Sequence, residues 1–220
     1  MVDIHTHIIP YVDDGSQSLE DSIAMIKHEI EIGVDTIIAT PHHIIHRYEK
    51  SVDEIKENFA LLENEVKRLN LPIKLLLGQE IYYSTREDTI SMLKEGKLLT
   101  LNNTNRVLLE FSFTREPEDV DDIIYNFNIN GYKVIIAHVE RYEWMTYQKI
   151  IDLKNEGALI QINSNSVLGL TTSKEKKFVK KLLKHNLVDF VASDTHSFRP
   201  STLDKSSKKI RNKELFNYTR

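Results

Sequence analysis

The sequence predicts an α/β protein, built as a distorted TIM-like (β/α)7 barrel. Short β-branched runs alternate with longer segments of helical period along nearly the whole chain, which is typical of parallel βα units. The chain has 220 residues, 40% hydrophobic and 28% charged, enough to bury one sizeable core. Residues that can bind metal ions follow nearly every expected strand.

Seven strands are expected, each a short apolar run bounded by polar residues. They cover residues 2–5, 34–40, 73–78, 107–111, 133–137, 158–162 and 188–192. Helices are expected at 18–32, 52–70, 118–130, 146–156 and 173–185, where apolar residues recur at helical spacing. Residues 82–100 show no clear pattern. Ser18 is expected to cap the first helix, and Gly33 and Gly157 to end two helices.

Composition narrows the classes of function. The chain has no cysteine, which excludes disulfides, thiolate ligands and a cysteine nucleophile, so histidines and carboxylates must carry any site. A net charge of -4 does not favour a nucleic-acid substrate. We find no apolar run long enough for a membrane span and no signal peptide, repeat or linker, so we expect one cytoplasmic domain over residues 1–220 without membrane insertion.

Potential metal ligands follow the expected strands one after another. They are His5, His7, His42, Glu80, Glu110, His138, Asp194 and His196. Because the carboxyl ends of parallel barrel strands open on one face, these side chains should converge there. A single histidine after a strand is usually a surface or hydrogen-bonded residue, so the repeated pattern carries the prediction. By the same reasoning His28, His46 and His185, in helices or an irregular loop, are left outside the site.

Two pairs at a spacing of two residues stand at opposite ends of the chain. His5 ends the first strand and His7 follows it, and Asp194 and His196 follow the last. This spacing places both members of a pair on the same side. If the sheet closes, the first and last strands become neighbours and the pairs can share ions. Imidazoles with carboxylates suit zinc, manganese or iron better than calcium.

Several motifs in order support a family resemblance. Asp-Ile-His-Thr-His at 3–7, Gly-Gln-Glu at 78–80, Ala-His-Val-Glu-Arg at 137–141 and Ala-Ser-Asp-Thr-His at 192–196 resemble the polymerase and histidinol phosphatase (PHP) family and its fold. His-Ile-Ile-Pro, Val-Asp-Asp-Gly, Gly-Gln-Glu-Ile-Tyr and Gln-Ile-Asn-Ser resemble its bacterial protein-tyrosine-phosphatase branch, which regulates capsule and exopolysaccharide synthesis. The resemblance runs from Met1 to about Pro200. Such relatives continue beyond their final helix, so the last barrel helix is expected to be short or incomplete.

The resemblance implies a centre of three divalent ions. One ion would be held by His5, His7, Glu80 and Asp194, a second by Glu80, Glu110 and His138, and a third by Asp14, His42 and His196. Glu110 and Asp14 replace histidines common elsewhere in the family, and the added negative charge favours manganese, with zinc or iron also acceptable. Spacing alone leaves Asp13 and His43 as alternatives to Asp14 and His42; the resemblance favours Asp14 and His42.

Two arginines are the expected catalytic contacts to the phosphoryl oxygens. Arg141 and Arg199 follow ligand histidines and can offer bidentate guanidinium contacts; the alternative for each is a surface salt bridge. Tyr82 and Tyr83 are interpreted as rim residues, and the lysines of 174–184 as the solvated face of an amphipathic helix.

The leading hypothesis is a metal-dependent protein-tyrosine phosphatase. By the resemblance, its substrate would be the phosphotyrosine tail of a bacterial tyrosine kinase that controls polysaccharide synthesis, attacked by metal-activated hydroxide. The alternatives are a small-molecule phosphatase of the histidinol-phosphate type, a nuclease, an amidohydrolase, or a catalytically silent regulator that binds the kinase. An amidohydrolase often needs a strand-end lysine, which this sequence lacks. The sequence does not indicate an oligomeric state.

Overall fold

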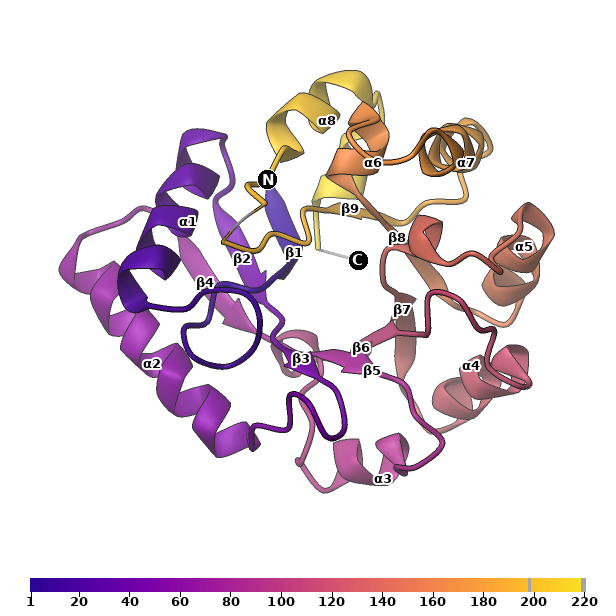
Figure 1. Cartoon of the computed structure of the whole chain (residues 1–220), viewed down its shortest axis with the longest axis horizontal. Helices are drawn as coiled ribbons and strands as arrows, with labels where there is room; N and C mark the ends of the chain where they lie inside the picture. Colours follow the sequence, from indigo (N-terminus) through magenta and orange to yellow (C-terminus); the bar gives the residue numbers. More distant parts are fainter. Residues whose placement is uncertain (198, 219–220) are drawn as a thin grey trace.

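A curled parallel β-sheet, covered on its outer side by helices, forms the centre of the molecule (Figure 1). The structure, a computed structural model, describes residues 1–197 and 199–218. The strands are β1 (Val2–Thr6), β2 (Thr36–Ala39), β3 (His42–His43), β4 (Lys74–Leu77), β5 (Glu80–Tyr82), β6 (Arg106–Glu110), β7 (Lys133–Ile136), β8 (Leu159–Asn163) and β9 (Phe190–Ala192). All strand pairs between these elements are parallel.

The helices follow the strands in alternation. They are α1 (Leu19–Glu31), α2 (Val52–Arg68), α3 (Thr89–Lys94), α4 (Val120–Ile129), α5 (Tyr147–Asn155), α6 (Ser164–Leu168), α7 (Ser173–Lys184) and α8 (Leu203–Lys209), with 3-10 turns at Leu101–Asn103, Val139–Arg141 and Lys213–Phe216. Ser18 caps α1 by accepting from the Asp21 amide, as expected. Gly33 and Gly157 have φ of 87° and 94°, the left-handed conformation that ends helices.

Two of the seven expected strands are interrupted. The run expected at 34–40 ends with β2 and resumes as β3 beyond Pro41, which cannot donate to the sheet. The run expected at 73–78 ends with β4 and resumes as β5 beyond Gly78, whose added Cβ would lie 2.6 Å from Leu101 Cδ2. The strand orders are therefore β1-β2-β4 and β3-β5-β6-β7-β8-β9.

The two ends of the curled sheet meet where β1 passes the segment after β9. Thr6 forms a parallel bridge with Thr195, the His7 amide donates to the Thr195 carbonyl at 3.0 Å, and the Asp194 amide donates to the His5 carbonyl at 2.9 Å. The expected neighbourhood of the first and last strands is thus confirmed. This contact brings together the two residue pairs from opposite ends of the chain.

Apolar side chains fill both faces of the sheet. An inner cluster includes Ile4, Ile38, Leu108, Ile135 and Phe190. Their strand neighbours face outward and pack under the helices, because side chains alternate along a strand. The β1–β2 register shifts between Asp3 and Thr6, so that the consecutive residues Ile4 and His5 both face the inside.

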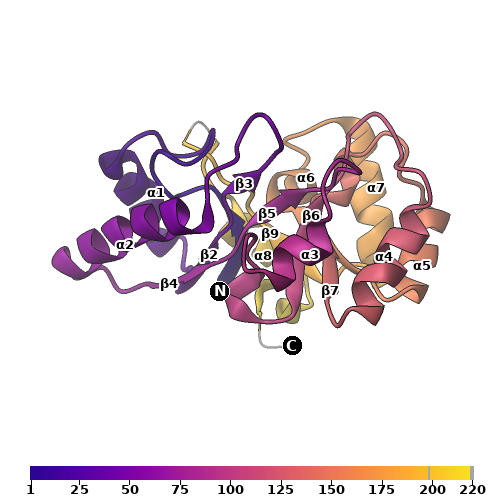
Figure 2. The ribbon, with the colours of Figure 1, turned by 90° about the horizontal axis from the view of Figure 1, so that it is seen from below.

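All strands point toward one face, where the loops that carry the polar residues lie (Figure 2). The N-terminus lies toward the opposite side. Within the described residues, no helix is both long and apolar enough to cross a membrane. The unclear region 82–100 contains the end of β5 and the short helix α3. The short helix α6 was not expected, whereas α8, with seven residues, agrees with the expectation of a short last helix.

Candidate metal centre

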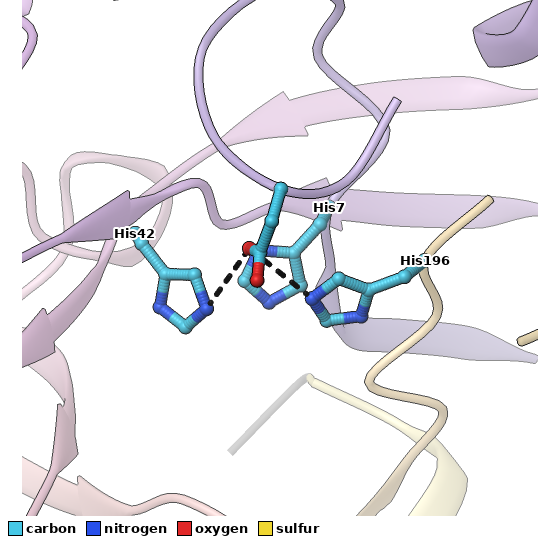
Figure 3. Close-up of side chains that lie close together, drawn as sticks. His7, His42 and His196 are labelled. Atoms are coloured by element: carbon cyan, nitrogen blue, oxygen red, sulfur yellow. Dashed lines mark ion pairs between the residues drawn. The ribbon is translucent and has the colours of Figure 1, made fainter. Parts of the chain in front are cut away.

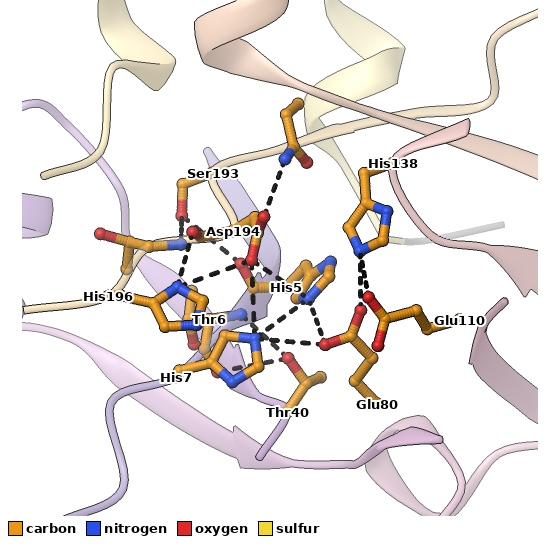
Figure 4. A network of polar contacts seen from close by, with 12 residues as sticks. His5, Thr6, His7, Thr40, Glu80, Glu110, His138, Ser193, Asp194 and His196 are labelled. Carbon is orange, nitrogen blue, oxygen red and sulfur yellow. Dashed lines mark hydrogen bonds and ion pairs between the residues drawn. The ribbon is translucent and has the colours of Figure 1, made fainter. Parts of the chain in front are cut away.

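Nine side chains expected to bind metal converge at the carboxyl ends of the strands. Figure 4 labels all of them except Asp14 and His42. They form four overlapping groups whose ligand atoms lie within 4.8 Å of one another: His5, His7 and Asp194; His5, Glu80 and His138; His42, Glu80 and Glu110; and His7, Asp14, His42 and His196. The sequence spacing of two for His5 and His7, together with the contact between β1 and the segment after β9, produces the first group. The overlap means that one pocket could hold several ions.

The imidazoles of His5, near the end of β1, and His7, just after it, face each other through their Nε2 atoms. Nε2 of His5 lies 3.2 Å from Nε2 of His7. Nδ1 of His5 lies 3.2 Å from Oε1 of Gln161, and Nδ1 of His7 lies 2.7 Å from Oδ2 of Asp13. Because these two oxygens can only accept, both Nδ1 atoms donate, and in the neutral rings that bind metals both Nε2 atoms present lone pairs to the same space. Two facing lone pairs fit a shared cation between them.

Two carboxylates complete this inner group. Oε2 of Glu80 lies 3.1 Å from Nε2 of His5 and 3.4 Å from Nε2 of His7. Oδ1 of Asp194 lies 3.7 and 3.6 Å from the same two nitrogens. Side chains of this chemistry and in this number fit a divalent transition metal.

Glu80 also reaches a second group, formed by Glu110 at the end of β6 and His138 just after β7. Its Oε1 lies 3.0 Å from Nε2 of His138, which lies 3.5 Å from Oε1 of Glu110. Its Oε2 lies 2.9 Å from Nδ1 of His42, yet neither of these buried atoms makes a hydrogen bond. Unpaired donor and acceptor atoms at this depth are costly without a further partner, which a metal ion would supply.

The outermost group surrounds one carboxylate near the surface. Oδ1 of Asp14 lies 3.6 Å from Nε2 of His42 and 3.6 Å from Nε2 of His196 (Figure 3). The His7 and His196 rings stack with their centres 4.1 Å apart. Asp14 is the more exposed member, with 40% of its side chain accessible. The arrangement therefore leaves this end of the centre open to a substrate.

Two residues of the centre have an uncommon backbone conformation. His138 has φ 30° and Asp194 has φ 53°, both in the left-handed region that non-glycine residues rarely adopt. Each follows a strand end, where the chain turns sharply to aim the side chain back over the sheet. Such strain is characteristic of functional positions.

The electrostatics of the centre reflect crowded carboxylates. Burial and then the nearby Glu80 charge raise the pKa of Glu110 to about 9. Burial would also raise the pKa of Glu80, but the adjacent His5 and His42 hold it well below its ordinary value. Burial lowers the pKa of His138 to about 4, which keeps this imidazole in the neutral form that coordinates metals. Bound cations would offset the carboxylate repulsion.

A pocket of about 410 Å³ opens above the centre. Its lining includes both expected arginines together with Arg47, Tyr48 and Phe113. Arg141 Nη1 lies 3.2 Å from Asp194 Oδ2, and Arg199 Nη2 lies 3.3 Å from His196 Nδ1. Both guanidinium groups therefore lie beside the cluster. Tyr82 also lines the pocket, whereas Tyr83 packs against Phe111 at 5.8 Å between ring centres.

The alternatives that the sequence left open have different surroundings. Asp13 bonds His7 Nδ1 and also accepts from the Gly15 and His42 amides, so it supports the loop and the ring. His43 turns to Glu87, with Nε2 3.0 Å from Oε2. Asp14 and His42 are the members of these pairs whose ligand atoms lie in the centre.

The three histidines left outside the site contact other parts of the molecule. His28 pairs with the Ser201 carbonyl at 2.9 Å, His46 is exposed beside Glu49, and His185 packs against the Tyr147 ring. None of them joins a metal-ligand group within the described part of the chain.

Sequence reasoning missed the residues that support the ligands. Gln161 accepts from the His138 amide at 2.8 Å and donates to Asn163 Oδ1 at 2.8 Å. Asn163 in turn donates to Asp194 Oδ2 at 2.9 Å. The alternation along β8 puts Gln161 and Asn163 on the inner face, and two amides inside an otherwise apolar strand were the available signal.

Comparison with known proteins gives a family match over the whole chain. Residues 1–220 match the model of the family "Capsular polysaccharide synthesis, CpsB/CapC". The tyrosine-protein phosphatase CpsB of Streptococcus agalactiae is 36% identical over 219 residues, covering 96% of this chain and 89% of the relative. The tyrosine-protein phosphatase YwqE of Bacillus subtilis is 36% identical over 203 residues, covering 90% of this chain and 78% of the relative.

Comparison with solved structures also finds tyrosine phosphatases among the similar proteins. A chain from the crystal structures of YwqE from Bacillus subtilis and CpsB from Streptococcus pneumoniae, described as unique metal-dependent tyrosine phosphatases, superposes with a TM-score of 0.89 at 33% identity, covering 99% of this chain and 88% of that one. Histidinol phosphate phosphatase from Lactococcus lactis superposes with a TM-score of 0.62 at 13% identity, covering 99% of this chain and 95% of that one. The second similarity is one of fold.

Proposed function

Because this chain belongs to the CpsB/CapC family of capsular polysaccharide synthesis, we propose that it hydrolyses phosphotyrosine in a protein substrate with the help of divalent metal ions. The observation that carries the proposal is the pair of imidazole Nε2 atoms 3.2 Å apart, with the carboxylates of Glu80 and Asp194 beside them. The names of the relatives, tyrosine-protein phosphatases, support the substrate class.

We propose a centre of three ions. His5, His7, Glu80 and Asp194 would hold the first; Glu80, Glu110 and His138 the second; and Asp14, His42 and His196 the third. When bound, divalent ions supply an activated water at neutral pH and charge to stabilise the phosphoryl group. Two of the ligand groups, one with His5, His7 and Asp194 and one with Asp14, His42 and His196, support the first and third ions. The second ion is supported by His138 Nε2, which lies 3.0 Å from Glu80 and 3.5 Å from Glu110, with Glu80 common to the first two ions. Manganese is the ion that the carboxylate-rich set favours, with zinc and iron as competitors.

Arg141 and Arg199 are the proposed catalytic contacts to the phosphoryl oxygens. Both line the pocket and lie beside the centre. Arg141 is held over the Phe113 ring at 4.3 Å and bonded to Asp194, so its orientation is fixed before a substrate arrives. A planar guanidinium can contact two phosphoryl oxygens at once, which orients the ester for reaction. Because lysine cannot make this paired contact, the Arg141→Lys variant should be less active than the wild type.

The proposed substrate is the phosphotyrosine tail of a bacterial tyrosine kinase in capsule or exopolysaccharide synthesis. The family's link to capsular polysaccharide synthesis supports this partner. Such a kinase domain needs ATP, so the proposed place of the reaction is the cytoplasm. A small-molecule phosphatase is less favoured, because the similarity to histidinol phosphate phosphatase extends to the fold alone.

Metal content and activity measured on one preparation test the proposal. The protein is stripped with chelator and dialysed against Mn²⁺, Zn²⁺ or Fe²⁺, bound metal is counted by elemental analysis, and hydrolysis of a phosphotyrosine peptide is followed. We expect three ions per chain and the greatest activity with Mn²⁺. Fewer than three ions at saturation, or equal activity in the stripped protein, would contradict the proposed centre.

A further inference from the structure

The loop after β3 places two side chains at the mouth of the pocket that the proposed phosphate chemistry does not use. Arg47 and Tyr48 line the same 410 Å³ pocket as Arg141 and Arg199. This loop, residues 44–50, rises above the neighbouring loops on the face where the strands end (Figure 2).

The backbone of the 44–50 loop is closed on itself. The Ile44 and Tyr48 backbones exchange hydrogen bonds of 3.0 and 2.8 Å, and the Arg47 amide donates to the Ile44 carbonyl at 2.9 Å. His46 takes the left-handed conformation, with φ 63°, that such a tight turn requires. Ser51 then caps α2 in a capping box with Glu54. Arg47 and Tyr48 are therefore held on a defined turn.

Side-chain contacts connect this turn to the metal centre. The Tyr48 ring is nearly parallel to the His42 ring, with an interplanar angle of 11° and centres 5.8 Å apart. Arg47 Cζ lies 4.9 Å from the centre of the Tyr48 ring. Arg47 itself is exposed. Its charge is thus presented to solvent from a position fixed by stacking on a candidate metal ligand.

The three arginines of the pocket differ in their surroundings. Arg141 and Arg199 contact Asp194 and His196 of the centre. Among the described residues, no ion pair joins Arg47 to a carboxylate, and its described side-chain contact is with the Tyr48 ring. An exposed guanidinium of this kind can take a carboxylate from a bound ligand in bidentate geometry.

The size of the pocket limits which part of a substrate can reach Arg47. A volume of 410 Å³ lies at the lower end of the range for small-ligand sites, enough for one phosphotyrosine side chain. The residues next to it in a peptide must then remain at the mouth. We propose that Arg47, supported by Tyr48, binds an acidic side chain adjacent to the phosphotyrosine, so that the enzyme prefers acidic phosphopeptides. This inference rests on the proposed function.

The preference for acidic neighbours is tested with three phosphotyrosine peptides. They differ only at the positions next to the phosphotyrosine, which carry Glu, Gln or Lys. For the manganese-loaded protein we expect kcat/KM to be about three- to tenfold higher for the Glu peptide than for the Gln peptide, with the gap shrinking at high salt. Arg47→Gln should remove the ranking, and Arg47→Glu should reverse it in favour of Lys. Arg86→Glu, at an exposed arginine outside this pocket, should keep the wild-type ranking.

Two results would overturn the inference. An equal loss for all three peptides in Arg47→Gln would place Arg47 on the phosphate, and an unchanged ranking in Arg47→Glu would remove it from recognition. Binding is measured separately by titration with non-hydrolysable phosphonate versions of the three peptides. The ratio of their Kd values gives the preference without any turnover. If the Glu peptide binds more tightly but no phosphotyrosine peptide is hydrolysed, the result contradicts the proposed function alone. Equal Kd values for the three peptides contradict the inference about Arg47.

Discussion

His5, near the end of β1, and His7, just after it, are each oriented by a hydrogen bond on the ring nitrogen that faces away from the other ring. Gln161 holds His5 and Asp13 holds His7, and this leaves both Nε2 atoms directed at one point. Oriented ligands bind metal more tightly than free ones because less rotational freedom is lost on coordination. The supporting amides and carboxylate are therefore part of the proposed function.

Gln161→Leu tests the support at the scale of one residue. The substitution removes the acceptor for His5 Nδ1 and for the His138 amide, and it releases Asn163. We expect a loss of about 10- to 100-fold in metal affinity or in kcat/KM. Equilibrium dialysis and phosphotyrosine hydrolysis measure the two effects. Gln148→Leu, at an exposed position on α5, is the control, and equal behaviour of the two variants would contradict the positioning role.

At the residue scale, the sequence was informative where regular structure fixes direction. Ligands such as Glu110 and His138 could be predicted because a strand end aims its side chains in a known way. Neighbours on an irregular loop, such as Asp13 and Asp14, could not be separated, because their side chains point in directions that only the folded loop defines. Arg47 and Tyr48 lacked a signal for the same reason.

Among the elements, the loop of residues 11–16 depends on close contact with β1. The Tyr11 amide donates to the Ser16 carbonyl, the Ser16 amide donates to the His7 carbonyl at 2.9 Å, and Gly15 lies against His7. A Cβ added at Gly15 would lie 2.1 Å from the His7 carbonyl oxygen, far inside contact distance. The loop must therefore shift if any side chain is placed there.

Gly15→Ala should displace the loop that carries Asp13 and Asp14. We expect at least about a tenfold loss of activity at limiting metal, partly recovered at high metal concentration, because the ligands are still present but misplaced. A metal titration of activity measures this shift. A titration curve equal to that of the wild type would show that the loop tolerates the methyl group.

Helix α1 contains a carboxyl group that folding keeps away from water. Burial, and then the Asp3 carboxylate, raise the pKa of Glu29 from 4.5 to about 9. Between these pH values the unfolded chain releases the proton and the folded chain keeps it, so this group makes the fold less stable as pH rises. Below about pH 4.5 both states are protonated and the penalty vanishes.

Glu29→Gln should therefore stabilise the protein at pH 8 and have little effect near pH 4.5. We expect a gain on the order of 1 to 3 kcal/mol in the free energy of unfolding at the higher pH. Urea unfolding at the two pH values measures it, with Glu31→Gln on the exposed face of α1 as control. An equal change at both pH values would contradict the buried-carboxyl account.

The elements themselves were predictable in proportion to their length. Helix α2, with apolar residues at regular spacing over Val52–Arg68, matched its expected range closely. The helices α6, of five residues, and α8, of seven, are too short for a periodic pattern to show. The short strands β3 and β5, which follow Pro41 and Gly78, could not be predicted, because they have only two and three residues and begin with polar side chains.

For the whole molecule, the metal centre joins segments from nearly the full length of the chain. His5 and His196 belong to segments that meet only when the sheet curls and its ends come together. From the count of strands and the paired motifs, the sequence predicted that the first and last strands would be neighbours if the sheet closed, and the bridge between Thr6 and Thr195 confirms that the two are neighbours. Ions bound here should therefore stabilise the curled sheet against unfolding.

Removing metal should lower the melting temperature. A ligand present at 100 times its Kd stabilises a folded protein by about 2.7 kcal/mol, or about 5 to 10 °C for a chain of this size. Thermal unfolding with chelator and with added Mn²⁺ measures the difference. The His5→Ala, His7→Ala double variant should show a much smaller shift, and a full shift in that variant would place the stabilising ions elsewhere.

The most direct test of the central claim compares hydrolysis of three substrates: a phosphotyrosine peptide, a phosphoserine peptide and histidinol phosphate. The protein is first stripped of metal and then restored with manganese, and the His5→Ala, His7→Ala variant is measured in parallel. We predict activity that returns with metal, favours phosphotyrosine and is lost in the variant. A protein that binds metal yet hydrolyses none of these esters would contradict the claim and favour a catalytically silent regulator.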